Sequence, residues 1–168
     1  AEARRYGEMV MAKARPYQHW VADPAPQALR IGMVSADFLS HPVGYFLESV
    51  LAHLKSSRLE LVAYPTVAEV DDLTARIKPC FSAWHPIDNL GDEAAARRIH
   101  DDGIHILIDL SGHTSHNRLP VFAWKPAPLQ VTWLGYFAST GVPGMDYLLA
   151  DRTSVPESHQ AHFTEKIW

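Results

Sequence analysis

The feature that most constrains the fold is a strand pattern that runs directly into a helix pattern in residues 29–54, LRIGMVSADFLSHPVGYFLESVLAHL. Leu29–Ser35 is apolar and β-branched enough for a buried strand, and Pro42–Leu54 repeats apolar residues at helical spacing. A buried parallel strand followed by a helix is the first half of a βαβ unit. The loop between them lies at the carboxyl edge of the sheet, where open α/β proteins bind ligands.

His41 lies in that loop, immediately before Pro42. Proline suits the first position of a helix, so Ser40 or His41 is expected to cap this one. The free N–H groups and the dipole of the first turn favour an anion such as phosphate and disfavour an imidazolium, so His41 should stay neutral and could accept a proton at pH 7. The alternative is a histidine that only caps a helix. Spacing alone favours the cap, because helix starts are common and catalytic ones are few.

Strand and helix patterns alternate through the rest of the chain. The expected strands are 58–64, 81–85, 104–110, 129–134 and 146–150, and the expected helices lie within 1–15, 69–78, 93–102 and 117–124. Asp92 is expected to cap the helix that begins at residue 93, and the end of the chain reads as a polar tail. This alternation predicts a three-layer α/β domain with a mostly parallel sheet. Residues 29–35 and 104–110 are apolar on both faces, so they should be neighbouring buried strands.

Polar side chains follow three of these strands at the points where the strands end. They are Asp37, His41, Ser111, His113, Thr114, His116, Tyr136, Ser139 and Thr140. Parallel strands end at the same edge of a sheet, so these side chains are expected to converge on one crevice. The alternative is that the loops are polar because they lie at the surface. Asp109 likewise has a simple interpretation, in which it hydrogen-bonds its own loop.

Composition excludes several classes of function. The 168 residues suit one domain, and 15 basic against 19 acidic residues argue against a nucleic-acid platform. No apolar run approaches a membrane span, and no signal peptide is visible. The single cysteine, Cys80, fits a reducing, cytoplasmic compartment. The ten histidines lack zinc-ligand spacings, and the chain has no GxSxG, GxxxxGK[ST] or GxGxxG motif, so no metal, P-loop or ordinary dinucleotide site is expected.

Three stretches carry a resemblance to a known family: LRIGMVSADFLSHPVGYF, ARRIHDDGIHILIDLSGHT and FAWKPAPLQVTWLGYFASTGVPGMDYLLAD. They resemble the catalytic region of the O-linked N-acetylglucosamine transferases, which include plant SPINDLY proteins and bacterial homologues with tetratricopeptide repeats. The resemblance covers residues 29–168, and the KPAPLQVTWLGY block is its most specific part.

The resemblance implies a GT-B glycosyltransferase, with two Rossmann-like lobes and an active site between them. Such enzymes transfer N-acetylglucosamine from the donor UDP-GlcNAc to Ser or Thr hydroxyls of protein acceptors, without a metal or other cofactor. Residues 29–168 resemble the N-terminal lobe only, so the C-terminal catalytic lobe would be a necessary partner. Residues 1–28 resemble a helix and linker that follow the repeats. By itself the chain should then be inactive.

The resemblance also assigns roles to single residues. His41 falls on the histidine of the family's HP motif, which has been considered a catalytic base. The resemblance also places His100 and His105 beside the cleft as polar support. Together with the loop residues and the helix start described above, the expected substrate-binding or supporting residues are Asp37, Pro42, His100, His105, His113, Tyr136 and Thr140. Two departures matter: Arg97 stands where an acidic residue is sometimes proposed as catalytic, and the family's YPGTSG loop reads YFASTG at residues 136–141. The alternative function is a scaffold module that keeps the fold without catalysis.

Overall fold

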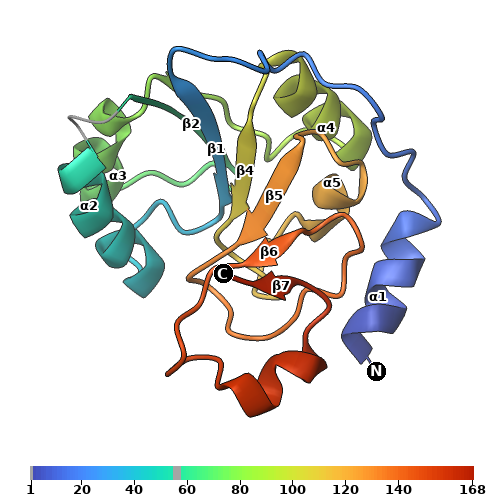
Figure 1. The fold of residues 1–168 in the computed structure, drawn as a ribbon. Coiled ribbons are helices and arrows are strands. Elements are labelled where there is room, and N and C mark those ends of the chain that lie inside the picture. Colours follow the sequence, from blue (N-terminus) through green and yellow to red (C-terminus); the bar gives the residue numbers. More distant parts are fainter. Residues whose placement is uncertain (1, 55–57) are drawn as a thin grey trace.

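The computed structural model describes residues 2–54 and 58–168, and Figure 1 shows its fold. In the described residues, one sheet has the strand order β3-β2-β1-β4-β5-β6-β7, with every neighbouring pair parallel. The strands are β1 (Leu29–Ser35), β2 (Leu59–Pro65), β3 (Ala83–Trp84), β4 (Ile106–Asp109), β5 (Leu129–Thr132), β6 (Tyr147–Leu148) and β7 (Lys166–Ile167). The expected parallel α/β fold is therefore confirmed.

Helices cover both faces of this sheet and give the three expected layers. They are α1 (Glu2–Met11), α2 (Pro42–Leu54), α3 (Asp72–Ile77), α4 (Asp92–Asp101) and α5 (Leu119–Ala123), with short 3-10 helices at η1 (Lys78–Cys80) and η2 (Glu157–His162). One core holds Leu47 of α2 and Leu73 of α3, and the other holds Ile99 of α4 and Phe122 of α5. Figure 1 shows α2 and α3 on one side of the sheet and α1, α4 and α5 on the other. Among the described residues, no helix is long and apolar enough to cross a bilayer.

The two strands with the strongest sequence signals are neighbours, as expected. Ile31 pairs with Ile106 and Val34 pairs with Asp109 in a parallel register. Met33 packs into the core under α2, whereas Val34 packs into the core under α4, because successive side chains of a strand point to opposite faces. The chain leaves β1 toward β2 on one side and later adds β4 on the other. The carboxyl ends of β1 and β4 therefore flank a switch point, where ligand crevices form.

Three details differ from expectation. Gly91, which has no side chain, occupies the N-cap of α4, so Asp92 lies in the first turn and pairs with Arg118 instead of capping the helix. The helix expected at 69–78 begins only at Asp72, because Asp71 and Thr74 form a capping box there. The polar tail is also ordered: it contains η2 and then β7, which adds an edge strand beside β6.

Candidate active site at the carboxyl edge of the sheet

The loop after β1 holds His41 at the start of α2, as the sequence predicts. The backbone N–H of Val43 donates to His41 Nδ1 at 3.3 Å, and the nearest oxygen of Asp37 lies 3.7 Å from the same nitrogen. The His41 side chain is 48% exposed, so it is accessible to solvent at the carboxyl edge of the sheet. Burial raises the pKa of the Asp37 carboxyl, although the charges of His41 and His116 act in the opposite direction.

The hydrogen bond to Nδ1 fixes the proton of a neutral His41 ring on Nε2, because an acceptor nitrogen must be unprotonated. The free side of the ring therefore presents an N–H donor. This geometry suits stabilisation of a developing negative charge better than removal of a proton. The expectation that neutral His41 accepts a proton would require Nδ1 to give up its contact with Val43.

A neighbouring helix holds the same loop in place. One oxygen of Asp71 accepts from the backbone N–H of Thr74 at 3.0 Å and so caps α3, while the other accepts from Ser40 N–H at 2.6 Å. These hydrogen bonds, led by the one from Thr74, hold the pKa of the Asp71 carboxyl well below its usual value. Asp71 therefore stays charged and links the His41 loop to α3 across thirty residues of sequence.

The loop after β4 is organised by Asp109, which is fully buried. Its carboxylate accepts from Ser111 N–H at 3.1 Å, Gly112 N–H at 2.9 Å and the Thr132 hydroxyl at 2.7 Å. Burial raises the pKa of Asp109 against the opposing effect of these donors. Gly112 has a φ of +56°, and a Cβ there would lie 2.3 Å from Tyr136 Cβ, so the turn requires glycine. Asp109 thus hydrogen-bonds its own loop, as its simple interpretation proposed.

That turn directs His113 toward the loop after β5. Its Nε2–H donates to the backbone carbonyl of Thr140 at 2.9 Å, and its ring meets the edges of Tyr6, at a centroid distance of 4.9 Å, and Tyr136, at 5.6 Å. Leu134, at the start of the loop after β5, has a φ of +76°, which costs free energy in a residue with a side chain. Such strain is found where the surrounding structure holds a loop in one functional shape.

Thr140 does not contribute its side chain to the crevice, which corrects one expectation. It is fully buried, its N–H donates to Glu165 at 2.7 Å, and its hydroxyl also donates to the Glu165 carboxylate. Only its carbonyl group acts at the site, by receiving the His113 hydrogen bond. Thr140 is therefore a support for His113 and not a residue that could contact a substrate.

His113 and Tyr136 line a cavity of about 460 Å³ at this edge of the sheet. Its lining residues are Glu2, Ala3, Tyr6, His113, Tyr136, Ala138, Ser139, His162 and Phe163. The contribution of α1 was not expected from the sequence, which shows only a short apolar stripe there. The described residues, 2–54 and 58–168, contain no group of three or more His, Cys, Asp or Glu side chains placed to hold a metal ion.

His100 and His105 lie at the opposite, amino edge of the sheet, so their expected position beside the cleft is wrong. His105 Nδ1 accepts from Arg30 N–H at 3.0 Å at the start of β1, and His105 Nε2 donates to the Asp23 carbonyl at 3.0 Å. His100 donates to the His19 carbonyl and stacks on Tyr17. The reason is topological, because α4 returns the chain to the amino edge before β4 begins. His105 therefore joins the linker to β1, and His100 joins it to α4.

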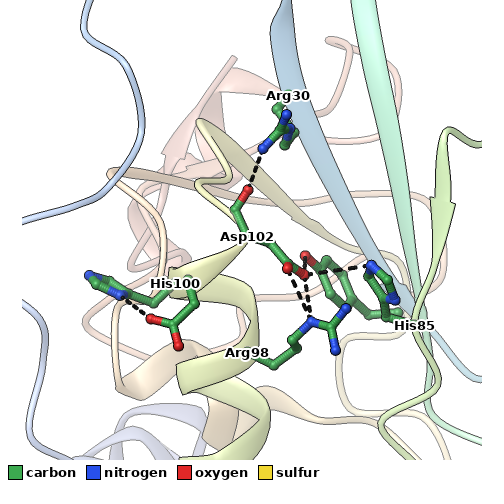
Figure 2. A network of polar contacts seen from close by, with 7 residues as sticks. Arg30, His85, Arg98, His100 and Asp102 are labelled. Atoms are coloured by element: carbon green, nitrogen blue, oxygen red, sulfur yellow. Dashed lines mark hydrogen bonds and ion pairs between the residues drawn. The ribbon is translucent and has the colours of Figure 1, made fainter.

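A polar network centred on Asp102 lies at the same amino edge (Figure 2). The Asp102 carboxylate accepts from the Tyr64 hydroxyl at 2.8 Å and from Arg98 Nε at 3.0 Å, and its carbonyl accepts from Arg30 Nη1 at 2.7 Å. His85 Nε2 lies 4.0 Å from the same carboxylate. The network joins β1, β2 and the end of α4 on the side away from His41, so it stabilises the fold and is not part of the crevice.

The KPAP block, which carries the most specific resemblance, is also structural. Lys125 has a φ of +52°, and its Nζ donates to the Gly144 carbonyl at 2.9 Å and to Asp146 at 2.5 Å. Asp146 accepts a second hydrogen bond from Gln130 N–H at 2.7 Å. The block therefore fixes β5 against the segment that leads into β6.

Comparisons with known proteins place this geometry in a family. The model of glycosyl transferase family 41 matches residues 6–168. A probable UDP-N-acetylglucosamine–peptide N-acetylglucosaminyltransferase SPINDLY of Hordeum vulgare is 35% identical over 173 residues, which cover 98% of this chain and 18% of that protein. The UDP-N-acetylglucosamine–peptide N-acetylglucosaminyltransferase of Caenorhabditis elegans is 38% identical over 144 residues, covering 84% of this chain and 12% of that protein.

A solved structure agrees with these sequence matches. A mutant of the O-GlcNAc transferase of Thermobaculum terrenum superimposes with a TM-score of 0.91 and 36% identity, over 99% of this chain and 32% of that one. The chain thus spans less than a fifth of the barley relative and about a third of the solved chain. The resemblance seen in the motifs is confirmed, and the chain belongs to glycosyl transferase family 41.

Proposed function

We propose that the protein containing this chain transfers N-acetylglucosamine from UDP-GlcNAc to Ser or Thr hydroxyls of proteins, with residues 29–168 as one lobe of the catalytic region. The observation that carries the proposal is the match of nearly the whole chain, in sequence and in fold, to an O-GlcNAc transferase. The names of the barley and nematode relatives point to the same donor and to a peptide acceptor.

Glycosyl transfer makes three demands on a protein. The hydroxyl must be held against the anomeric carbon, its proton must be accepted, and the leaving diphosphate must be stabilised by donors and positive charge. In our proposal the carboxyl edge of the sheet, at the loops after β1 and β4, serves this reaction. His41 donates from Nε2 to an oxygen of the leaving diphosphate, beside the first turn of α2 that begins at Pro42. Asp37 lies 3.7 Å from the other ring nitrogen, Nδ1. The proton of the attacking hydroxyl passes to an oxygen of the leaving diphosphate as the bond to the anomeric carbon forms.

The proposal includes partners and conditions. A C-terminal lobe would supply most of the contacts to the nucleotide, and tetratricopeptide repeats would precede α1, as the family resemblance implies. The transfer would need no metal or other cofactor, so a chelator should leave the rate unchanged. A cytoplasmic location agrees with the single free thiol of Cys80.

The test measures transfer of radiolabelled N-acetylglucosamine to a Ser- and Thr-containing protein acceptor by the intact protein. We expect transfer by the wild type and a loss of about 100-fold or more in turnover for His41→Ala, because removing one donor to a developing negative charge typically costs that much. Melting temperature should change little, since a lost helix cap costs only about 1 kcal/mol.

His53→Ala is a matched control for this test. His53 lies in the last turn of the same helix, is exposed, and contacts only the Ser49 carbonyl among the interactions described for it. Its replacement should leave turnover unchanged. Near-normal turnover in His41→Ala would leave His41 as a helix cap only. Failure of the wild type to transfer sugar to any acceptor would favour the scaffold alternative.

A further inference from the structure

His113 differs from the other site histidine in the way its ring is held. The Nε2–H donates to the Thr140 carbonyl at 2.9 Å, and a carbonyl can only accept, so this nitrogen must carry the proton. A neutral ring therefore leaves Nδ1 as a bare acceptor. At His41 the backbone contact is made by Nδ1 instead, so that ring presents a donor. The carboxyl edge of the sheet thus holds one histidine that donates and one that accepts.

The structure also holds the His113 ring rigidly. Asp109 and the positive φ of Gly112 shape the turn before it, and Tyr6 and Tyr136 contact the ring with interplanar angles of 75° and 73°. An acceptor that is fixed before the ligand arrives loses little entropy on binding, which is the arrangement a recognition group needs. None of the contacts described for His113 involves Nδ1.

The surroundings of His113 indicate the chemistry of the ligand. It lines the cavity of about 460 Å³ together with the rings of Tyr6, Tyr136 and Phe163 and with a second histidine, His162. The lining is more apolar than charged, and among the described residues Glu2 is its only carboxylate. Aromatic walls with one fixed nitrogen acceptor suit a neutral hydroxyl-bearing group. They do not suit a phosphate, which has no proton to donate to Nδ1 when fully ionised.

We propose that His113 contacts the substrate directly, by accepting through Nδ1 a hydrogen bond from a hydroxyl group that enters this cavity. This inference rests on the proposed function, because the hydroxyl belongs either to the donor sugar or to the Ser or Thr of the acceptor. Helix α1 is then part of the binding site through Tyr6, although more than a hundred residues separate it from His113 in the sequence.

Two substitutions separate this role from a structural one. In His113→Gln the side-chain amide reaches the position of Nε2 and can donate to the Thr140 carbonyl, but nothing replaces Nδ1. In His113→Asn the side-chain oxygen lies near the position of Nδ1 and can accept, but the contact with Thr140 is lost. We therefore expect the Gln variant to keep the melting temperature and lose activity. The Asn variant should lose stability and keep more activity.

The measurement is sugar transfer by the intact protein, with kcat and KM determined separately for UDP-GlcNAc and for the acceptor. His113→Gln should lower kcat/KM by about 10-fold, the expected loss for one hydrogen bond to substrate. A rise in KM for the donor would assign the hydroxyl to the sugar, and a rise in KM for the acceptor would assign it to Ser or Thr. In histidine-labelled protein, the nitrogen NMR shifts of neutral His113 should show the proton on Nε2.

The outcomes separate this inference from the proposed function. If the wild type transfers sugar and His113→Gln stays within twofold of it, His113 only ties two loops together and the inference is overturned. The same conclusion follows if activity tracks melting temperature in both variants, or if NMR finds the proton on Nδ1. A wild type that transfers no sugar would overturn the proposed function, and the inference with it.

Discussion

Replacing Tyr64 by Phe should make the stability of the protein less sensitive to alkaline pH. Tyr64 is fully buried in β2, and its hydroxyl donates to Asp102 at 2.8 Å. Burial, reinforced by the Asp102 charge, raises the pKa of Tyr64 far above its ordinary value near 10. Folded Tyr64 therefore keeps its proton when the unfolded chain has already lost it.

The sign and size of the effect follow from proton linkage. A group with a raised folded pKa contributes stability that is complete below its unfolded pKa and is lost as the pH rises toward the folded value. For an unfolded pKa of about 10, the loss is about 0.4 kcal/mol at pH 10 and about 1.4 kcal/mol at pH 11. At neutral pH the Tyr64→Phe variant should be about 1 kcal/mol less stable, since it lacks one hydrogen bond. Asp102 is not left unpaired in that variant, because Arg98 still donates to it at 3.0 Å.

The two stability curves should therefore cross near pH 10.5, at about the point where the linkage loss of the wild type equals the missing hydrogen bond. Urea unfolding of both proteins at pH 8, 10 and 11 would measure this. Other groups that titrate in the range, such as lysines, are common to both proteins and cancel in the difference. Parallel curves above pH 10 would refute the argument, because they would mean that Tyr64 ionises equally easily in the folded and unfolded states.

Two further substitutions test the contacts that shape the cavity beside His113. Gly7→Ala would place a Cβ 1.8 Å from the Gly141 carbonyl oxygen, so α1 must shift. We expect the free energy of unfolding, measured by calorimetry, to fall by about 1–2 kcal/mol. In the control Gly91→Ala the new Cβ meets nothing within 4 Å, and the loss should be less than about 1 kcal/mol. The free energy of unfolding of Asp109→Asn should rise relative to that of the wild type as the pH rises above about 4, because the raised pKa of Asp109 makes its ionisation more costly in the folded state than in the unfolded state. Urea unfolding of both proteins at several pH values would measure this. If the stability of the variant fell relative to the wild type as the pH rose, the prediction would be contradicted.

Local patterns predicted the centre of the fold well. The bounds of β1 and α2 agree with the sequence patterns at both ends, because a dense apolar run and a regular helical stripe meet at Pro42. His41 was placed correctly for the same reason, since proline fixes the helix start and the strand fixes the edge of the sheet. These features depend on residues close together in sequence, where periodicity carries the information.

Two of the features that were missed, the burial of Thr140 and the contact of Tyr6 with His113, depend on contacts between distant residues. Thr140 reads as an available hydroxyl until Glu165, 25 residues later, is found hydrogen-bonded to it in the interior. Tyr6 reads as one member of a weak helix stripe, and only the packed structure brings it to His113. His100 and His105 were misplaced because a family segment was assigned to the cleft as a block. The chain direction alone puts the end of α4 and the start of β4 at the amino edge.

The most recognisable part of the sequence is not the part that bears the proposed chemistry, and the structure gives a reason. The roles of Lys125 and Asp146 demand specific side chains, because a cation and a carboxylate must meet between β5 and β6. Gln130 also acts through its side chain, whose amide donates to the Phe122 and Gly144 carbonyls. The two site histidines are instead oriented by a backbone N–H and a backbone carbonyl, which almost any residue could supply. A motif search therefore finds the residues around the Lys125–Asp146 ion pair more readily than the site histidines. The backbone contacts of His41 and His113 determine which ring nitrogen carries the proton in the neutral form. Only the three-dimensional structure shows these contacts.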